Sequence, residues 1–170
     1  MLPTTRLGKS GFDVTRLGFG SMGLRGPRTW GVRVVDEEQA ERVLHSVLDH
    51  GINFIDTAPD YGIAEERIGR FLSGRRSEFY IATKCGCSPV QHAEHLEVLH
   101  TWSADTIRKN VETSLSRLQT DHIDLLQFHG GQLAKLKSEG LIELLMDYRA
   151  QGVIGSIGVS TKLPDALEHI

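Results

Sequence analysis

The chain has 170 residues, of which 39% are hydrophobic and 24% are charged, and its formal net charge is −3. This length and composition are typical of one soluble globular domain, so we treat residues 1–170 as a single domain and exclude a disordered or fibrous class. No run rich in Lys or Arg indicates a nucleic-acid partner. An apolar signal core and a stretch of about 18 apolar residues are both absent from the sequence. We therefore expect a cytoplasmic protein with no membrane partner.

Strands and helices are predicted to alternate along the chain. Residues 5–14 form two short extended runs around a Gly-containing loop, which favours a β-hairpin before the main fold. Residues 17–21 predict a first buried strand, and a long loop containing Pro27 follows it. Helical periodicity begins at Asp36 with a start that resembles a capping box, and it ends at Gly51.

The same alternation continues to the end of the sequence. Further strands are predicted over 53–56, 79–84, 123–128 and 153–159, and helices over 65–72, from Ser103 to Leu118, and over 133–148, the last weakened by Gly140. Nearly continuous apolar strands between helices predict a parallel sheet covered by helices, with about five βα units. Pro164 fits the first turn of one more helix, and the sequence stops inside that helix at Ile170. We interpret that ending as a truncation.

Polar side chains stand at the ends of three consecutive predicted strands. These are Asp56, Lys84 and His129, and Tyr61 lies in the loop after the first strand. Each alone has a simple structural explanation, as a turn, loop or solvated residue. However, the carboxyl ends of parallel strands share one face, where ligands bind and catalytic residues converge. Their joint placement favours one shared site.

This set of residues suits the reduction of a carbonyl group. The carbonyl oxygen needs a proton as hydride reaches the carbon, and a phenol, with a reference pKa near ~10, donates poorly at neutral pH unless its anion is stabilised. A nearby ammonium stabilises that anion, and a carboxylate keeps the ammonium charged and oriented. Lys84 and Asp56 suit these two roles beside Tyr61, and His129 could hydrogen-bond the substrate oxygen.

At this point the sequence resembles a known family. The segments FIDTAPDYG, IATK and HIDLLQFH resemble the three active-site segments of the aldo-keto reductases. The start RLGKSGFDVTRLGFGSMG is similar to that family's hairpin and first barrel strand, and GVIGSIGVS to its strand before the nicotinamide amide site. The resemblance implies an α/β fold, a TIM barrel of which this chain is the N-terminal half to two-thirds. A TIM barrel typically needs ~250 residues, so about three βα units are missing.

The resemblance also implies an activity. It is that of an NAD(P)-dependent oxidoreductase that interconverts a carbonyl and an alcohol on an aldehyde, ketone or aldose, with an aldose dehydrogenase-like subgroup as one option. It makes Tyr61 the proton donor, Lys84 and Asp56 the pair that tunes it, and His129 the residue that orients the substrate. NADP or NAD, not covalently bound, would contact Gly20, Ser21, Met22, Asp56, Ser160 and Thr161, and the substrate would contact Tyr61, His129 and Trp102.

Two departures from the family pattern affect these expectations. Ser160-Thr161 stands where many members have Ser-Asn, which leaves the second amide contact open. Gly130-Gly131 follows the histidine where many members have Pro or Arg with Asp. We expect a more flexible loop and different substrate contacts there.

Three other overall interpretations remain. Gly18, Gly20 and Gly23 satisfy GxGxxG, but a Rossmann site requires a helix to begin there, and a loop with Pro27 intervenes. A flavodoxin-like domain would have the right size for five βα units. A non-catalytic half-barrel that self-associates through its open edges is the main alternative function, because unpaired edges expose backbone and apolar surface.

The loop after the third predicted strand is rich in potential metal ligands. Cys85, Cys87, His92, His95 and His100 crowd it, but they form no CxxC pair and lack the spacing of a zinc finger. We expect free thiols, no metal, and a loop that lines the substrate pocket. Trp102 could form an apolar wall there or pack on the barrel. In the first loop Arg25, Arg28 and Arg33 are candidates for an anionic ligand, although exposed basic residues are usually only solvated.

Overall fold

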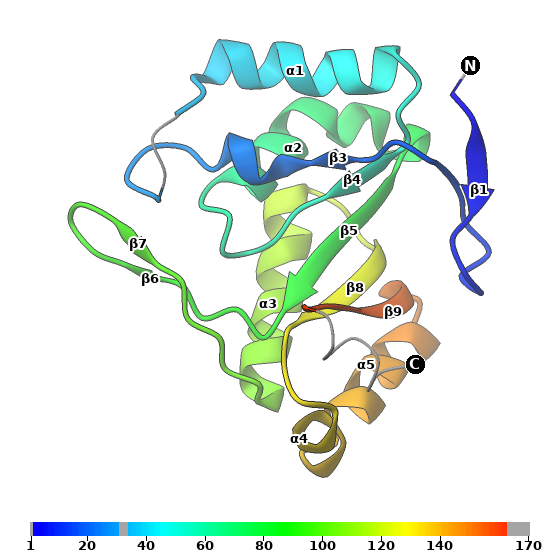
Figure 1. Ribbon diagram of the computed structural model, residues 1–170, viewed down its shortest axis with the longest axis vertical. Helices are drawn as coiled ribbons and strands as arrows, with labels where there is room; N and C mark the ends of the chain where they lie inside the picture. The colour runs from blue at the N-terminus through cyan, green and yellow to red at the C-terminus, as the bar shows by residue number, and fades with distance from the viewer. Residues whose placement is uncertain (1, 31–33, 163–170) are drawn as a thin grey trace.

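The structure is a computed structural model, and it describes residues 2–30 and 34–162. Its centre is a parallel sheet of five strands in the order β3-β4-β5-β8-β9 (Figure 1). The strands are β3 Phe19–Gly20, β4 Phe54–Asp56, β5 Tyr80–Cys85, β8 Ile123–His129 and β9 Ile154–Ser160. The predicted fold class is confirmed as α/β with a parallel sheet, and within the described residues β3 and β9 are the unpaired edges.

An antiparallel hairpin precedes the sheet, as predicted. Its strands are β1 Thr4–Arg6 and β2 Asp13–Thr15. It reaches the amino ends of the sheet strands, because the Thr15 amide donates to Asn53 just before β4 at 2.7 Å. Phe12 stacks on Tyr80 at the start of β5, with ring centroids 4.8 Å apart. The hairpin therefore covers the end of the sheet opposite to the predicted site.

The helices lie on one side of the curved sheet (Figure 1). They are α1 Glu37–Asp49, α2 Ala64–Leu72, α3 Ala104–Leu118, α4 Leu133–Ser138 and α5 Leu141–Ala150, with 3-10 helices at Ser21–Leu24 and Ser73–Glu78. The expected caps are present, since Asp36 accepts from the Gln39 amide and Ser103 from the Thr106 amide. No described helix combines the length and the apolar character that a membrane span requires.

Strand register places alternate residues on the face of the sheet away from the helices. On β8, the outward Leu126 and Phe128 are buried under helices, whereas the inward Leu125, Gln127 and His129 are half-buried. Pairing extends this inward row across the sheet, since Asp56 pairs with Ala82, Lys84 with Gln127, and His129 with Ser160. The predicted site residues on three strands therefore share the inner face.

Three element predictions need correction. The first strand is two residues long and not buried, because β3 is a sheet edge, where Phe19 is half-buried and Leu17 is 57% exposed. Residues 133–148 form two helices and not the single predicted one. Gly140 lies between them in the left-handed conformation, with φ +65°, and this interrupts the helical backbone. The loop after β5 contains an unpredicted antiparallel ribbon, β6 Val90–Gln91 with β7 Leu96–Glu97. The helix expected at Pro164 lies outside the described residues.

The topology also separates the alternative folds. A flavodoxin-like sheet has the order 2-1-3-4-5, with a reversal between its strands, whereas this order runs in sequence from one edge to the other. A four-residue 3-10 helix follows β3 at the glycine motif, and in the part of the chain that the structure describes the first α-helix begins at Glu37. The Rossmann and flavodoxin-like interpretations are therefore wrong, and a sequential βα order is that of a barrel.

Candidate active site

A buried ion pair lies at the carboxyl ends of β4 and β5. The Lys84 Nζ atom is 2.7 Å from Asp56 Oδ1 and donates to the Thr57 carbonyl at 2.8 Å. The Lys84 side chain is only 2% exposed, whereas that of Asp56 is 34% exposed and also accepts from Gln127 at 3.1 Å. A buried ammonium requires such partners. The charge of Lys84 is thus fixed in place at the mouth of the sheet.

Tyr61 lies directly over this ammonium. Lys84 Nζ is 4.8 Å from the centroid of the Tyr61 ring, within the range of a cation–π contact. The loop that carries Tyr61 packs tightly, because Gly62 has φ +54° and a Cβ there would lie 2.0 Å from the Arg25 carbonyl oxygen. The His129 ring is 6.3 Å from the Tyr61 ring in an edge arrangement. The structure therefore brings all four predicted residues together.

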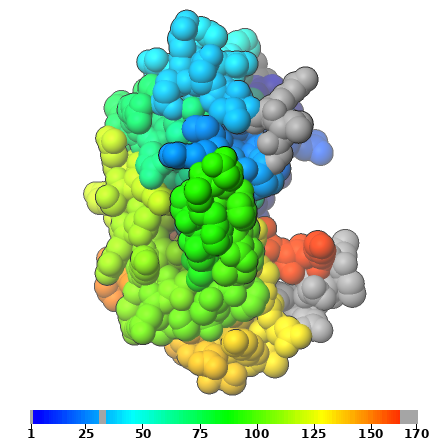
Figure 2. Space-filling view, turned by 90° about the vertical axis from the view of Figure 1, so that its left-hand side faces the viewer, coloured from blue at the N-terminus to red at the C-terminus, as the bar shows by residue number. Residues whose placement is uncertain are grey.

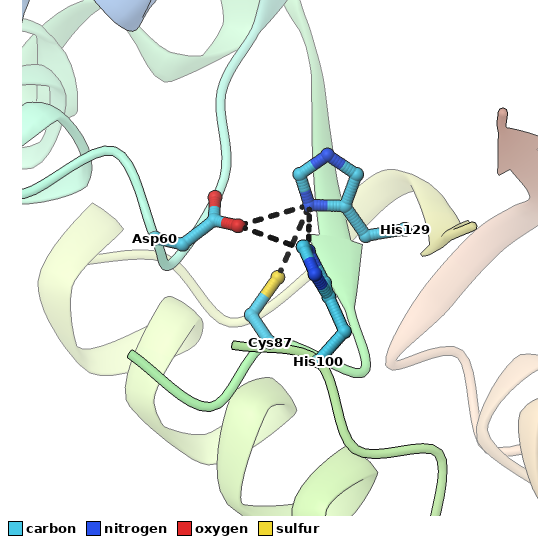
Figure 3. A group of neighbouring side chains, drawn as sticks. All are labelled: Asp60, Cys87, His100 and His129. Carbon is cyan, nitrogen blue, oxygen red and sulfur yellow. Dashed lines mark hydrogen bonds and ion pairs between the residues drawn. The ribbon is translucent and has the colours of Figure 1, made fainter. Parts of the chain in front are cut away.

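His129 also belongs to a second cluster of side chains, which the sequence patterns did not predict. Asp60, Cys87 and His100 surround its Nδ1 atom, at 3.1 Å for Asp60 Oδ2, 3.4 Å for Cys87 Sγ and 3.1 Å for His100 Nε2 (Figure 3). His100 Nε2 is itself 3.2 Å from Asp60 Oδ2. Asp60 and Cys87 are 1% and 2% exposed. The other ring nitrogen of His129 points away from these three side chains (Figure 3).

Burial and mutual charge set the ionisation of this cluster. Burial alone raises the pKa of Asp60, but the hydrogen bond and charge of His129 outweigh it, and the pKa lies below the ordinary value. Burial raises the pKa of the Cys87 thiol, and the Asp60 charge adds to this. Burial lowers the pKa of His100. At neutral pH the cluster therefore holds a carboxylate and a protonated thiol.

Two chain segments and a helix hold this cluster in place. Cys87 and His100 pair in an isolated antiparallel β-bridge at the base of the β6–β7 ribbon. From α3, the Asn110 side chain accepts from the amides of Gly86 and Cys87 and donates to the Cys87 carbonyl at 2.9 Å. Figure 2 shows the ribbon, in bright green, standing in front of the molecule. Asn110 gave no sequence signal, because it lies within a regular helix.

The potential metal ligands that the sequence places in the loop after β5 therefore lie in different parts of the structure. Cys85 is fully buried in the hydrophobic core between sheet and helices, and His92 and His95 stack on each other on the exposed ribbon. Only Cys87 and His100 reach the site. Both cysteines are free thiols, as expected. The sequence could have suggested Asp60 only through its place between Asp56 and Tyr61.

The residues that the family resemblance assigned to a cofactor lie around the same inner face. Gly20 pairs with Asp56, and nothing stands within 4 Å of where its Cβ would be. Ser21 is buried, and neither its Oγ nor Thr57 Oγ1 has a hydrogen-bond partner among the described residues. Met22 is 47% exposed. Open space beside unpartnered buried hydroxyls is a suitable surface for a polar ligand.

At the far edge of the sheet, Ser160 pairs with His129. Its carbonyl accepts from the Gly130 amide at 2.8 Å, and Ser160 and Thr161 are both half-buried. Gly130 and Gly131 have φ of +76° and +94°, values that glycine adopts readily. Whether these residues contact a nicotinamide amide stays a prediction.

Trp102 packs against the base of the ribbon. An added Cβ on Gly86 or on Gly131 would lie 2.9 Å from its indole ring, and the ring stacks on His100 with centroids 5.9 Å apart. Its buried Nε1 has no hydrogen-bond partner within the described ranges, and a contact of Trp102 with the substrate stays a prediction.

The arginines of the first loop take different places. Arg25 donates to the carbonyls of Met22 and Trp30, which ties the loop together. Arg25 and Arg28 line a surface hollow of ≈ 450 Å³ between this loop and the ribbon. Arg33 lies outside the described residues.

Comparison with known proteins identifies one family. The model of the Aldo/keto reductase family matches residues 16–170. Among curated proteins, the chain is 34% identical over 169 residues to L-galactose dehydrogenase of Arabidopsis thaliana, covering 93% of this chain and 48% of that protein. It is 30% identical over 179 residues to D-threo-aldose 1-dehydrogenase of a Pseudomonas species, covering 93% and 53%. The chain spans about half the length of the curated relatives that it matches.

Solved structures agree with this result. An aldo-keto reductase from Bacillus halodurans, in its holo form, superposes with a TM-score of 0.85 at 37% identity, covering 99% of this chain and 53% of that one. A glycerol dehydrogenase from Gluconobacter oxydans superposes with a TM-score of 0.80 at 32% identity, covering 97% and 50%. The sheet is therefore part of a TIM barrel.

Proposed function

Because the chain belongs to the aldo/keto reductase family, we propose that it carries the acid-base half of an NAD(P)-dependent oxidoreductase. The reaction interconverts a carbonyl and an alcohol on a small aldehyde, ketone or aldose. The observation that carries the proposal is the buried Lys84 ammonium, paired with Asp56 and lying beneath the Tyr61 ring. Relatives named as sugar dehydrogenases favour a sugar or a similar polyhydroxylated substrate. The non-catalytic half-barrel is not favoured, since these relatives are named dehydrogenases.

The proton transfer follows from this arrangement. In the reducing direction the Tyr61 hydroxyl donates its proton to the carbonyl oxygen, and the phenolate that forms lies beside the fixed Lys84 charge. Asp56 holds that charge in position from below. The nitrogen of His129 that points away from Asp60, Cys87 and His100 would hydrogen-bond the substrate oxygen. In the oxidising direction the same groups remove the alcohol proton.

The inner face offers residues that fit a nicotinamide cofactor. Gly20, Ser21 and Met22 would hold it at one side, Ser160 and Thr161 at the other, with Asp56 between them. The unpartnered buried Ser21 Oγ and the space beside Gly20 support this assignment. When bound, NADP or NAD supplies or accepts the hydride. A metal plays no part in this reaction as proposed.

Turnover of the intact protein tests the proposal. We expect oxidation of NADPH or NADH with small aldehydes, or reduction of the oxidised cofactor with aldoses. Tyr61→Phe removes the proton donor and should lower kcat/KM about 10²- to 10⁴-fold. Tyr80→Phe is the matched control, because Tyr80 stacks on Phe12 at the opposite end of the sheet. Equal turnover in wild type and Tyr61→Phe would contradict the assigned role.

A further inference from the structure

We propose that Asp60, Cys87, His100 and His129 form a binding site for one divalent transition-metal ion of the zinc class. The four potential ligand atoms lie within 4.8 Å of one another. They come from the loop after β4, both strands at the base of the β6–β7 ribbon, and the end of β8, so a bound ion would tie these segments together. The sequence had drawn attention to a different set of potential ligands in the loop after β5, and we expected no metal there. Only Cys87 and His100 belong to both sets.

The spacing of the ligand atoms suits tetrahedral zinc. Bond lengths of ~2.0–2.1 Å to nitrogen and ~2.3 Å to sulfur imply ligand-to-ligand distances of about 3.3–3.8 Å around a tetrahedron. Four of the six distances between ligand atoms run from 3.1 to 3.4 Å, and the other two, from Cys87 Sγ to the Asp60 and His100 atoms, lie within 4.8 Å. An ion at the centre therefore requires those four distances to lengthen by a few tenths of an ångström. Two imidazoles, one thiolate and one carboxylate are all ligands that zinc accepts.

Hydrogen bonds alone leave the cluster unsatisfied. One atom, His129 Nδ1, faces three potential partners, and a single proton can be shared with only one of them at a time. Asp60 Oδ1 is buried and has no hydrogen-bond partner among the described residues, whereas Oδ2 lies 3.1 Å from His129 Nδ1 and 3.2 Å from His100 Nε2. A buried carboxylate oxygen without a partner is costly. A cation at the centre would contact all four groups at once.

The charges of the cluster also match a dication. On binding, the ion displaces the thiol proton of Cys87 and any proton on His129 Nδ1 or His100 Nε2, and these protons pass to solvent. The bound state then holds a 2+ ion with one thiolate, one carboxylate and two neutral imidazoles, with no net charge. Asp60 and Cys87 are only 1% and 2% exposed. Because an uncompensated charge is costly in such a buried site, a neutral set of ion and ligands suits it. The Asn110 clamp on the Cys87 backbone pre-positions the thiol.

The site has a consequence for His129 that rests on the proposed function. A metal on Nδ1 fixes the ring as the tautomer that carries its proton on Nε2, the nitrogen that points away from the cluster (Figure 3). That proton is the one needed to hydrogen-bond a substrate oxygen. The ion therefore acts as a positioning device for His129 and does not take part in the chemistry.

Cobalt binding to the intact protein tests the site without reference to turnover. Titration with Co²⁺ should give one equivalent with the visible bands of tetrahedral geometry and a thiolate charge-transfer band, and Zn²⁺ should displace it. Cys87→Ala should abolish the charge-transfer band, and His100→Gln should weaken binding beyond the ~10–100-fold typical for loss of an outer partner. Cys85→Ala and His92→Gln are the matched controls and should bind as wild type does.

Any of three results would overturn the proposal. Co²⁺ that binds without a charge-transfer band, or equally well to Cys87→Ala, would show that the ion lies elsewhere, and loss of binding in His92→Gln would place it on the exposed ribbon. Nitrogen NMR of His129 provides a second readout, in which Zn²⁺ should shift Nδ1 and leave a protonated Nε2. Tyr61→Phe should leave all these spectra unchanged, so failure of the proposed reaction and failure of the metal site are distinguishable.

Discussion

At the residue scale, the site depends on one charge that has little access to water. The Lys84 ammonium has two oxygen partners, Asp56 and the Thr57 carbonyl, and the aromatic face of Tyr61. A buried ion pair stabilises a fold less than its Coulomb energy suggests, because both groups lose their hydration. The contribution of the Lys84–Asp56 ion pair is therefore to hold the ammonium charge in a fixed position. Loss of one partner should therefore affect both stability and turnover.

Asp56→Asn tests this dependence. The substitution keeps the shape but leaves the 2% exposed ammonium without a counter-charge. Because Asp56 is partly exposed, water can replace some of the lost interaction, and we expect the free energy of unfolding to fall by about 1–3 kcal/mol. Denaturant unfolding measures it. Gln127→Met removes only a 3.1 Å hydrogen bond to Asp56 and should have a smaller effect. Equal losses in both variants would contradict the assigned importance of the charge.

At the element scale, a buried acid joins two helices and a strand. Glu65 on α2 is fully buried and accepts 2.7 Å hydrogen bonds from Thr83 on β5 and Ser114 on α3. Burial raises its pKa above the usual value of 4.5, and these hydrogen bonds and Arg117 offset only part of that effect. A carboxyl with a higher pKa in the folded state stabilises the fold fully below its unfolded pKa. That contribution is lost as pH rises through the folded pKa.

The pH dependence of Glu65→Gln follows from that sign. The amide stays neutral at every pH and its oxygen can still accept both hydroxyl hydrogen bonds. As pH rises from about 4 towards neutrality, wild type should lose stability relative to Glu65→Gln. Paired denaturant melts across this pH range measure the difference. If the stability of wild type instead rises relative to that of Glu65→Gln as pH increases, the ion pair between Glu65 and Arg117 outweighs the effect of burial.

The elements also show what sequence patterns can and cannot predict. Strands β4, β5, β8 and β9 were predictable because each is a short apolar run with a sharp end, and so the site residues at those ends were predictable too. The break between α4 and α5 at Gly140 was not predictable. The helical spacing of apolar residues continues across it, and this spacing carries no information on the φ of +65° at Gly140. The β6–β7 ribbon has strands of two residues, too short for alternation. Asp60 was missed because its partners depend on the Cys87–His100 bridge.

At the scale of the whole molecule, the sheet has two free edges in the described residues. β3 and β9 each have a neighbour on one side only, and Leu17 and Met22 beside β3 are 57% and 47% exposed. Unpaired edges with apolar flanks promote association. The 170-residue chain studied alone should therefore self-associate with rising concentration in sedimentation velocity experiments. A single monomeric species at all concentrations would contradict this expectation.

Deuterium transfer tests the central claim most directly. The intact protein would be incubated with a carbonyl substrate and reduced cofactor that carries deuterium at the transferred position of the nicotinamide. We expect an alcohol with deuterium on the former carbonyl carbon, and loss of this product in Tyr61→Phe but not in Tyr80→Phe. An alcohol without deuterium, or equal deuterium transfer in Tyr61→Phe, would contradict a reductase that works through Asp56, Tyr61, Lys84 and His129.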